Sequence, residues 1–194
     1  MNIAIYVYDH AEVLDFSGPF EVFSTANRLS SGAAPFNVFL VAQRKVPVLA
    51  RGGYSVNPHY GLGAHPDIDL LLIAGGYHDE QVKTPEVIAW VASVAEKAEC
   101  VTSVCTGAFI LAEAGLLAGC EATTHWEDIS ALASDYPDVV VVESQRWVDS
   151  GRVVTSAGIS AGIDMSLHLV SRFVGAELAE ITARKMDYKW VKSD

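Results

Sequence analysis

The stretch "CVTSVCTGAFILAEAGLL", residues 100–117, decides the fold class. Its first five residues form a β-prone, largely apolar run, which indicates a strand buried on both faces. A helical pattern begins at Thr106, directly after Cys105, and continues to about Leu117. A buried strand that passes at once into a helix is typical of parallel α/β sheets. The stretch therefore predicts an α/β fold with a cysteine at the elbow between strand and helix.

Strands and helices alternate along the rest of the chain. The predicted strands cover residues 2–8, 36–42, 51–58 (a turn and a short strand), 69–74, 100–104, 139–143 and 145–158, the last being a hairpin that turns at 149–151. The predicted helices cover about 19–29, 84–98, 106–117, 126–134 and 160–174, and the tail 176–194 is expected to be helical and then frayed. This alternation predicts a mostly parallel central sheet covered on both faces, in one domain spanning residues 1–194.

Composition limits the kinds of function. The 194 residues, 51% of them hydrophobic, suit one globular domain with a full core. A formal net charge of -11 argues against nucleic-acid binding, which favours basic surfaces, and suits a neutral or weakly polar small ligand. No apolar run approaches the ~18 residues of a membrane helix, so we expect no membrane association.

Cysteine usage and the lack of known motifs narrow the class further. The N-terminus has no basic signal-peptide region, and three cysteines are an odd, low count that indicates reduced thiols. We therefore expect a cytoplasmic location. The sequence contains no Cys-x-x-Cys or His-x-x-x-His pair of the kind that binds zinc. A dinucleotide-binding loop must be followed by a helix, and none is predicted after the Gly-x-Gly at 61–63. We expect neither a metal nor an organic cofactor.

Cys105 is the first candidate for chemistry. Ligands of open α/β sheets bind beyond the carboxyl ends of the strands, where this residue falls. The free N–H groups and dipole of the following helix stabilise a thiolate, so the pKa of the thiol is predicted to be lowered. The Thr106 hydroxyl can donate to the sulfur or to a ligand, and Gly107 permits close approach. The alternative is that Cys105 only packs in the core, as most free cysteines do.

Three further segments are expected to reach the same end of the sheet. Gly75 and Gly76 follow a predicted strand, and their N–H groups suit an oxyanion hole, although a plain tight turn explains them equally. Asp15 precedes a predicted helix, where a carboxylate either caps the helix or moves protons beside a sulfur. His125 lies at a helix start and acts either as a base or as a structural group.

Other residues with reactive or charged side chains are interpreted as structural. Cys100 begins a strand and Cys120 follows a helix, so packing explains both. Glu21 and Asp164 are interpreted as surface or helix-end charges.

Four motifs together resemble the DJ-1/PfpI (ThiJ) superfamily. They are "LDFSGPFEVF" at 14–23, the elbow at 101–117, "ATTHW" at 122–126 and "TSAGISAGID" at 155–164. The resemblance runs from the first strand to about residue 175 and is strongest to isocyanide hydratases and to the ligand-sensing domains of AraC-type regulators. It implies a flavodoxin-like three-layer sandwich, usually a homodimer.

The resemblance also implies roles for single residues. Cys105 matches the elbow nucleophile, Asp15 matches the acidic residue near the thiol of isocyanide hydratases, and Thr106 matches the residue that follows the cysteine. Gly75 and Gly76 match the glycine pair near the nucleophile, as an oxyanion or ligand-binding element. His125 matches the pocket histidine of the "TTH" motif, seen in DJ-1-like members.

Departures from the family pattern separate the possible activities. PfpI-type proteases carry a histidine where this chain has Thr106, so proteolysis is not expected. DJ-1-like glyoxalases and deglycases typically carry glutamate where this chain has Asp15. AraC-type regulators continue into a helix-turn-helix region, for which the chain up to Asp194 leaves no room, so no nucleic-acid partner is expected.

The leading hypothesis is an isocyanide hydratase-like enzyme. Cys105 attacks the isocyanide carbon to give a thioimidate, Asp15 relays protons, and water releases an N-formamide. Two alternatives remain open. One is a DJ-1-like glyoxalase or deglycase acting on 2-oxoaldehydes, with His125 or Asp15 moving the proton. The other is a non-catalytic ligand- or redox-sensing domain.

Overall fold

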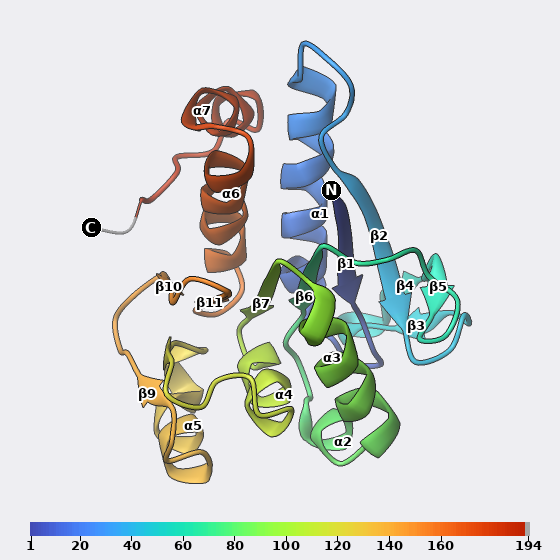
Figure 1. The fold of residues 1–194 in the computed structure, drawn as a ribbon, viewed down its shortest axis with the longest axis vertical. Helices are drawn as coiled ribbons and strands as arrows, with labels where there is room; N and C mark the ends of the chain where they lie inside the picture. The colour runs from blue at the N-terminus through green and yellow to red at the C-terminus, as the bar shows by residue number, and fades with distance from the viewer. Residues whose placement is uncertain (193–194) are drawn as a thin grey trace.

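A central sheet of seven strands runs through the computed structural model, which describes residues 1–192 (Figure 1). In spatial order the strands are β10 (Trp147–Asp149), β11 (Val153–Ser156), β7 (Cys100–Val104), β6 (Leu70–Ile73), β1 (Asn2–Tyr6), β2 (Asn37–Ala42) and β5 (Tyr60–Gly61). Every neighbouring pair is parallel except the hairpin of β10 and β11. The mostly parallel sheet predicted from the sequence is confirmed.

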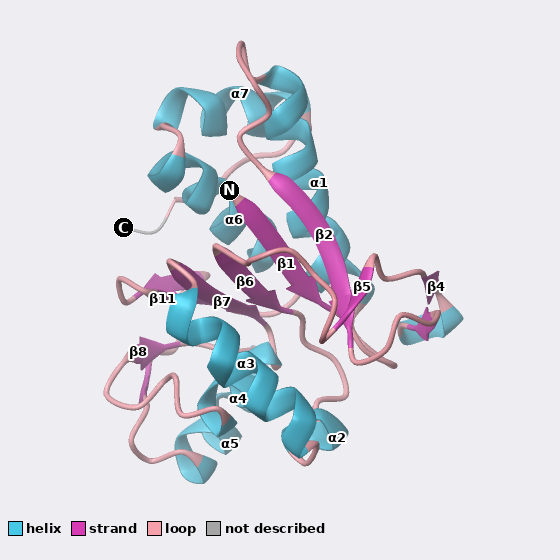
Figure 2. Cartoon of the chain, turned by 45° about the vertical axis from the view of Figure 1, so that its right-hand side comes forward, coloured by secondary structure: helices cyan, strands magenta, loops and turns pink. Residues whose placement is uncertain are grey.

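Helices cover both faces of this sheet, as Figure 2 shows. One face carries α1 (Val13–Leu29), α6 (Ala161–Phe173) and α7 (Ala176–Lys185), which contact one another. The other face carries α2 (Asp79–Val82), α3 (Pro85–Lys97), α4 (Gly107–Glu113) and α5 (Ile129–Asp135). Within residues 1–192, no helix combines the length and the apolar character needed to cross a membrane.

Short elements complete the chain. Two small sheets pair β3 (Val48–Leu49) with β4 (Ser55–Val56) and β8 (Glu121–Ala122) with β9 (Val140–Val141), and two 3-10 turns are η1 (Arg51–Gly53) and η2 (Trp126–Asp128). These pieces lie in the loops around the carboxyl ends of the large strands, and η1 and η2 both contribute residues to the pocket described below.

The central strands are buried on both faces, which explains their continuous apolar sequences. Every residue of β6 and β7 is buried, and so are the last four of β1. A polar side chain inside this layer forms a hydrogen bond to the backbone: the Thr102 hydroxyl donates to the carbonyl of Leu71 on the neighbouring strand at 3.2 Å. The strand predicted at 100–104, the helix beginning after Thr84 and the hairpin turning at 149–151 are confirmed.

The first helix begins earlier than predicted. The expected start near Pro19 was wrong, because α1 begins at Val13 and carries Pro19 in its interior. Proline removes one helical N–H donor, which makes an interior position costly, so the sequence rule favours a start at the proline. Asp15 therefore lies in the first turn of the helix rather than before it.

Two other boundaries also differ from the prediction. Helix α4 ends at Glu113 instead of about Leu117, because Gly115 takes a left-handed φ of 75° and the Leu116 N–H closes back onto the Leu111 carbonyl. Only residues 140–141 of the predicted strand 139–143 are strand. The tail is helical over Ala176–Lys185 as predicted. The frayed end predicted after it was wrong as far as Val191, because Tyr188, Trp190 and Val191 each donate a hydrogen bond to Asp164. Residues 193–194 lie outside the described residues.

Asp164 lies in the first turn of α6, which agrees with a position at a helix end, but it is not at the surface, and that part of the prediction was wrong. It is fully buried in α6, where Oδ2 accepts from Arg146 Nε at 2.5 Å and from the Tyr188 hydroxyl at 3.1 Å. Oδ1 accepts from the Val191 N–H at 2.8 Å. The segment after α7 thus folds back over the carboxylate, a long-range contact that the local sequence does not reveal. Glu21, by contrast, is exposed and paired with Arg28, as predicted.

Asp164→Asn is expected to lower the free energy of unfolding by about 1–3 kcal/mol, because a buried charged acceptor of three hydrogen bonds is replaced by a weaker neutral one. Urea unfolding at pH 7 measures the change. The matched control is Glu21→Gln, whose exposed ion pair is worth less than about 0.5 kcal/mol. Equal losses in the two variants would contradict a structural role for the buried carboxylate.

Candidate active site

Cys105 occupies a strained elbow between β7 and α4. Its φ is 55°, a left-handed conformation that residues other than glycine rarely adopt. The backbone is held on both sides, since its N–H donates to the Ser156 carbonyl at 3.1 Å and its carbonyl accepts from the Thr124 hydroxyl at 2.8 Å. A cysteine elbow at the carboxyl end of a central strand is therefore confirmed.

Gly107 makes this elbow possible. A Cβ on Gly107 would overlap the carbonyl oxygen of Ile73, at the end of the neighbouring strand β6. Only glycine lets the start of α4 pass so close to that strand, which is the close approach expected from the sequence.

Asp15 and Cys105 meet around the backbone of Gly75. The carboxylate of Asp15 is fully buried, and its Oδ2 accepts a hydrogen bond from the Gly75 N–H at 3.0 Å. A Cβ on Gly75 would lie 2.7 Å from Asp15 Oδ2, 2.7 Å from Cys105 Cβ and 2.7 Å from the Thr106 nitrogen. The structure thus brings together the carboxylate, the sulfur-bearing residue and the threonine that the sequence singled out.

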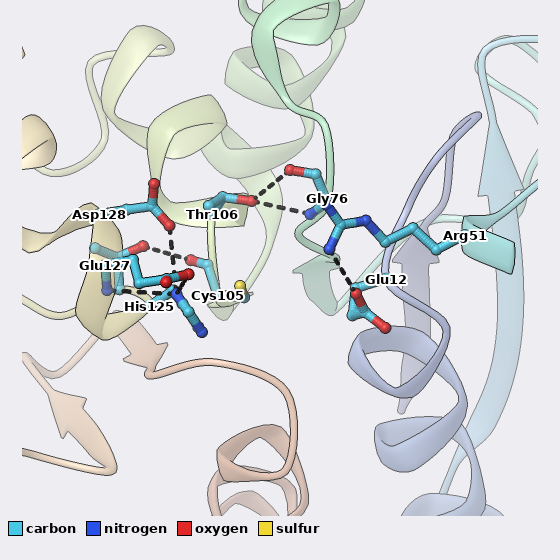
Figure 3. Close-up of polar contacts among 9 residues, drawn as sticks. Glu12, Arg51, Gly76, Cys105, Thr106, His125, Glu127 and Asp128 are labelled. Carbon is cyan, nitrogen blue, oxygen red and sulfur yellow. Dashed lines mark hydrogen bonds and ion pairs between the residues drawn. The ribbon is translucent and has the colours of Figure 1, made fainter.

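Thr106 connects the elbow to the second glycine. Its hydroxyl donates to the Gly76 carbonyl at 2.9 Å and accepts from the Gly76 N–H at 2.9 Å (Figure 3). The N–H groups of Gly75 and Gly76 therefore both have partners inside the protein. Their use as an oxyanion hole stays a prediction, and it requires these partners to be displaced.

Burial sets the protonation of the thiol. Burial first and the Asp15 charge second raise the pKa of the Cys105 thiol to about 12, and the N–H and hydroxyl of Thr106 oppose this rise only in part. The lowered pKa expected from the helix N-terminus was wrong. The dipole of a short helix acts against two larger effects here, the loss of solvent and a neighbouring carboxylate.

Asp15 is a buried carboxyl group with a raised pKa. Burial raises the pKa of its carboxyl to about 7, although hydrogen bonds from Gly75 and from the Cys105 side chain lower it. Near neutral pH the carboxylate can accept the proton of the thiol, which leaves a thiolate beside a neutral acid. The arrangement has the geometry needed for a thiol paired with a neighbouring base.

His125 reaches the same pocket from the opposite side. It precedes η2, and its Nδ1 lies 3.6 Å from Glu127 Oε2 and 3.5 Å from Asp128 Oδ2. Its ring packs directly on Gly158, where any side chain would overlap it. Figure 3 shows this group on one side of Cys105, with Glu12 and Arg51 on the other.

A pocket of about 270 Å³ opens above the elbow. It is lined by Glu12, Arg51, Gly76, Tyr77, His78, Asp79, Cys105, Thr106, His125, Glu127, Asp128 and Ile159. Asp15 and Gly75 are not among these lining residues, and the carboxylate lies behind the elbow, beside Gly75 and Cys105. A volume of this size suits a small molecule.

Several wall residues were missed by sequence reasoning. Arg51 pairs with Glu12 at 3.1 Å and lies over the ring of Tyr77 at 4.5 Å, but these three come from separate loops with no shared motif. Tyr77 directly follows the glycine pair at the end of a strand, and this position was the one sequence signal that could have placed it in the pocket wall. Ile159 carries a φ of 57°, which is unusual for a β-branched residue and is not visible in the sequence.

A family model for DJ-1/PfpI proteins matches residues 1–172. The chain belongs to the DJ-1/PfpI family. The solved structure of a ThiJ/PfpI family protein from Pseudomonas syringae superposes on this chain with a TM-score of 0.87 at 30% sequence identity. The match covers 98% of this chain and 76% of that protein.

Curated relatives of this DJ-1/PfpI chain have different activities. An isonitrile (isocyanide) hydratase from Pseudomonas putida is 31% identical, covering 97% of this chain and 78% of that protein. The HTH-type transcriptional regulator CdhR from Pseudomonas aeruginosa is 34% identical, covering 86% of this chain. The chain spans about half the length of this regulator, 49%. Family membership alone therefore does not select an activity.

Gly75→Ala is expected to slow alkylation of Cys105 by iodoacetamide on the order of 100-fold at pH 8, because the new methyl group forces Asp15 away from the sulfur. Peptide mass spectrometry measures the rate at this cysteine. Gly63→Ala is the control, since a Cβ there meets nothing within 4 Å. Unchanged alkylation in a folded Gly75→Ala protein would mean that the carboxylate is not needed for the reactivity of the thiol.

The raised pKa of Asp15 also makes stability depend on pH. The folded-state pKa of about 7 exceeds the ordinary value of 3.8, so the favourable contribution of the neutral acid is complete below about pH 4 and lost as the pH rises through 7. A shift of about three pH units corresponds to on the order of 4 kcal/mol.

Asp15→Asn, which stays neutral, should therefore gain on the order of 4 kcal/mol of unfolding free energy relative to wild type between pH 4 and pH 8. Urea unfolding at a series of pH values measures this difference. Asp135→Asn, at an exposed site on α5, controls for the general effect of removing a carboxylate. A difference that does not vary with pH would show that Asp15 ionises normally.

Proposed function

We propose that this chain is an isocyanide hydratase-like enzyme that adds water to an isocyanide and releases an N-formamide. The observation that carries the proposal is the packing of Asp15 and Cys105 against the same backbone position, Gly75, which places a base beside the thiol. The 31% identity to an isonitrile hydratase over 97% of this chain supports it.

The first half-reaction forms a covalent adduct. The thiol of Cys105 gives its proton to Asp15, and the sulfur adds to the terminal carbon of the isocyanide. Asp15 then delivers that proton to the same carbon, which gives an S-linked thioimidate. A carboxyl with a pKa of about 7 suits both steps, because it accepts and returns a proton near neutral pH.

The second half-reaction consumes water. Water adds to the thioimidate carbon, Asp15 accepts one of the two water protons, and the nitrogen takes the other. The carbon–sulfur bond breaks, the N-formamide leaves, and the proton on Asp15 returns to the sulfur of Cys105. Thr106 borders both the elbow and Gly76, so its hydroxyl can orient the adduct.

The pocket suits this reaction in size and enclosure. A neutral, linear isocyano group needs little width, and about 270 Å³ accommodates a small organic substituent.

A sensing role is the second candidate, favoured by the 34% identity to a transcriptional regulator of about twice this length. In that case Cys105 or the pocket binds a small ligand without turnover. Activity on 2-oxoaldehydes is the remaining enzymatic alternative. The homodimer, the cytoplasmic location, the lack of a nucleic-acid partner and the lack of a metal or organic cofactor stay predictions.

Wild-type protein is expected to convert cyclohexyl isocyanide to the corresponding formamide, and Cys105→Ala is expected to abolish this because the nucleophile is gone. Asp15→Asn should lower kcat by about 10²–10⁴-fold through loss of the proton relay. Chromatographic detection of the formamide measures both. Cys120→Ala, which changes a cysteine outside the pocket, should retain full activity.

Two outcomes would contradict the proposal. Turnover that survives in Cys105→Ala removes the thioimidate from the mechanism. A folded wild-type protein without formamide production removes the hydratase activity, and lactate formation from methylglyoxal then separates the 2-oxoaldehyde enzyme from the sensor.

A further inference from the structure

Tyr8 is a buried ionisable residue that the proposed reaction leaves unused. It lies two residues after β1 and is 4% exposed. Its hydroxyl is fully buried and has no hydrogen-bond partner among residues 1–192. The same is true of one carboxylate oxygen, Oδ1 of Asp15. Buried polar groups in native proteins almost always have a partner, so both atoms call for an explanation.

The register of the sheet aligns the backbone of Tyr8 with that of Gly75 and Cys105. Tyr6 of β1 pairs with Ile73 of β6, and Ile73 pairs with Ser103 of β7, so these residues form one row across three adjacent strands. Tyr8, Gly75 and Cys105 each lie two residues beyond that row.

The segment from Tyr8 to Asp15 is a short loop held in place by backbone hydrogen bonds. The Ala11 N–H donates to the Tyr8 carbonyl at 3.0 Å, and the Glu12 N–H donates to the Gly75 carbonyl at 2.8 Å. The Asp15 N–H then donates to the Glu12 carbonyl at 3.1 Å. Tyr8 and Asp15 therefore stand at the two ends of a turn that is fastened to Gly75.

Electrostatics agrees with this placement. Burial raises the pKa of the Tyr8 hydroxyl well above its ordinary value, and the negative charges of Asp15 and Cys105 raise it further. The phenol is therefore neutral near pH 7 and can donate a hydrogen bond, whereas ionised Asp15 can only accept. The two buried atoms without partners are thus complementary: one is a donor and the other is an acceptor.

We propose that the Tyr8 hydroxyl donates to Asp15 Oδ1 through one bridging water molecule, and thereby sets the pH at which Asp15 takes the proton of Cys105. The contact runs through water because neither atom has a protein partner within hydrogen-bond distance. Tyr8 is then a positioning residue that acts through Asp15. This inference rests on the acid–base role of Asp15 in the proposed function, but not on the identity of the substrate.

The direction of the effect follows from the bond. A hydrogen bond donated to the ionised carboxylate favours that form, so the donor lowers the pKa of Asp15 and opposes the effect of its burial. Without the donor, the effect of burial is opposed less, so the pKa of Asp15 rises and the carboxyl group stays protonated to higher pH. The thiol then loses its base over the range in which the wild-type protein is reactive.

The test compares Tyr8→Phe with Tyr6→Phe. Both substitutions remove one hydroxyl from neighbouring buried tyrosines whose rings lie 5.8 Å apart, but the Tyr6 hydroxyl donates to Gln81 Oε1 at 2.7 Å and serves no site residue. The readout is the rate of Cys105 alkylation by iodoacetamide from pH 5 to pH 10, followed by peptide mass spectrometry. This readout needs no substrate, so a failure of the hydratase proposal does not affect it.

Wild-type alkylation is expected to rise with pH around 7, where Asp15 ionises. In Tyr8→Phe the midpoint should move up by about one pH unit, which slows alkylation at pH 7 about fivefold. Tyr6→Phe should keep the wild-type midpoint. Asp15→Asn should lose this rise altogether, which assigns the midpoint to Asp15.

Two results would overturn the proposal. One is an unchanged midpoint in Tyr8→Phe, most clearly if that variant also unfolds at higher urea concentration, since removing a hydroxyl that has no partner relieves a buried polar group. The other is an equal shift in Tyr6→Phe, which would trace the effect to general changes in packing.

Discussion

The packing of Asp15, Cys105 and Thr106 around the backbone of Gly75 is the constraint on which the rest of the site depends. A side chain at Gly75 would contact all three within 2.7 Å, so glycine alone lets a buried carboxylate reach the sulfur. Gly107, two residues after Cys105, meets a similar demand, because α4 starts against the end of β6. The two glycines thus allow a buried carboxyl group and a cysteine to pack against each other at the connection between strand and helix.

The parallel sheet explains why residues so far apart in the chain meet there. Strands β1, β6 and β7 are neighbours in register, so whatever follows each strand is delivered to one edge of the sheet. Helix α1, on the face of the sheet opposite to α4, supplies the carboxylate. It begins at Val13, so Asp15 lies in its first turn. The connection to β6 is fixed by the Glu12 N–H, which donates to the Gly75 carbonyl.

The strand–helix alternation, the cysteine elbow and the glycine pair could be predicted from the sequence because each is a local pattern with a local physical cause. The pKa of Cys105 could not, since it depends on burial and on a carboxylate 90 residues away in the chain, and a helix dipole was the only local cue. Asp164 was misjudged for the same reason: the segment that covers it returns from beyond α7. The ion pair of Arg51 and Glu12 joins two loops that share no motif.

A thiol that is buried and protonated favours catalysis over redox sensing. Redox-sensor cysteines combine a low pKa with solvent access, so that they are already thiolates and react with dilute oxidants. Cys105 has the opposite properties, a pKa raised to about 12 and an exposed fraction of 7%, and in the proposed mechanism it gains nucleophilicity only when Asp15 accepts its proton. Such a sulfur reacts with what the pocket admits and holds beside the base. Selectivity then comes from access and proton transfer together, which is what an enzyme acting on a small, neutral electrophile requires.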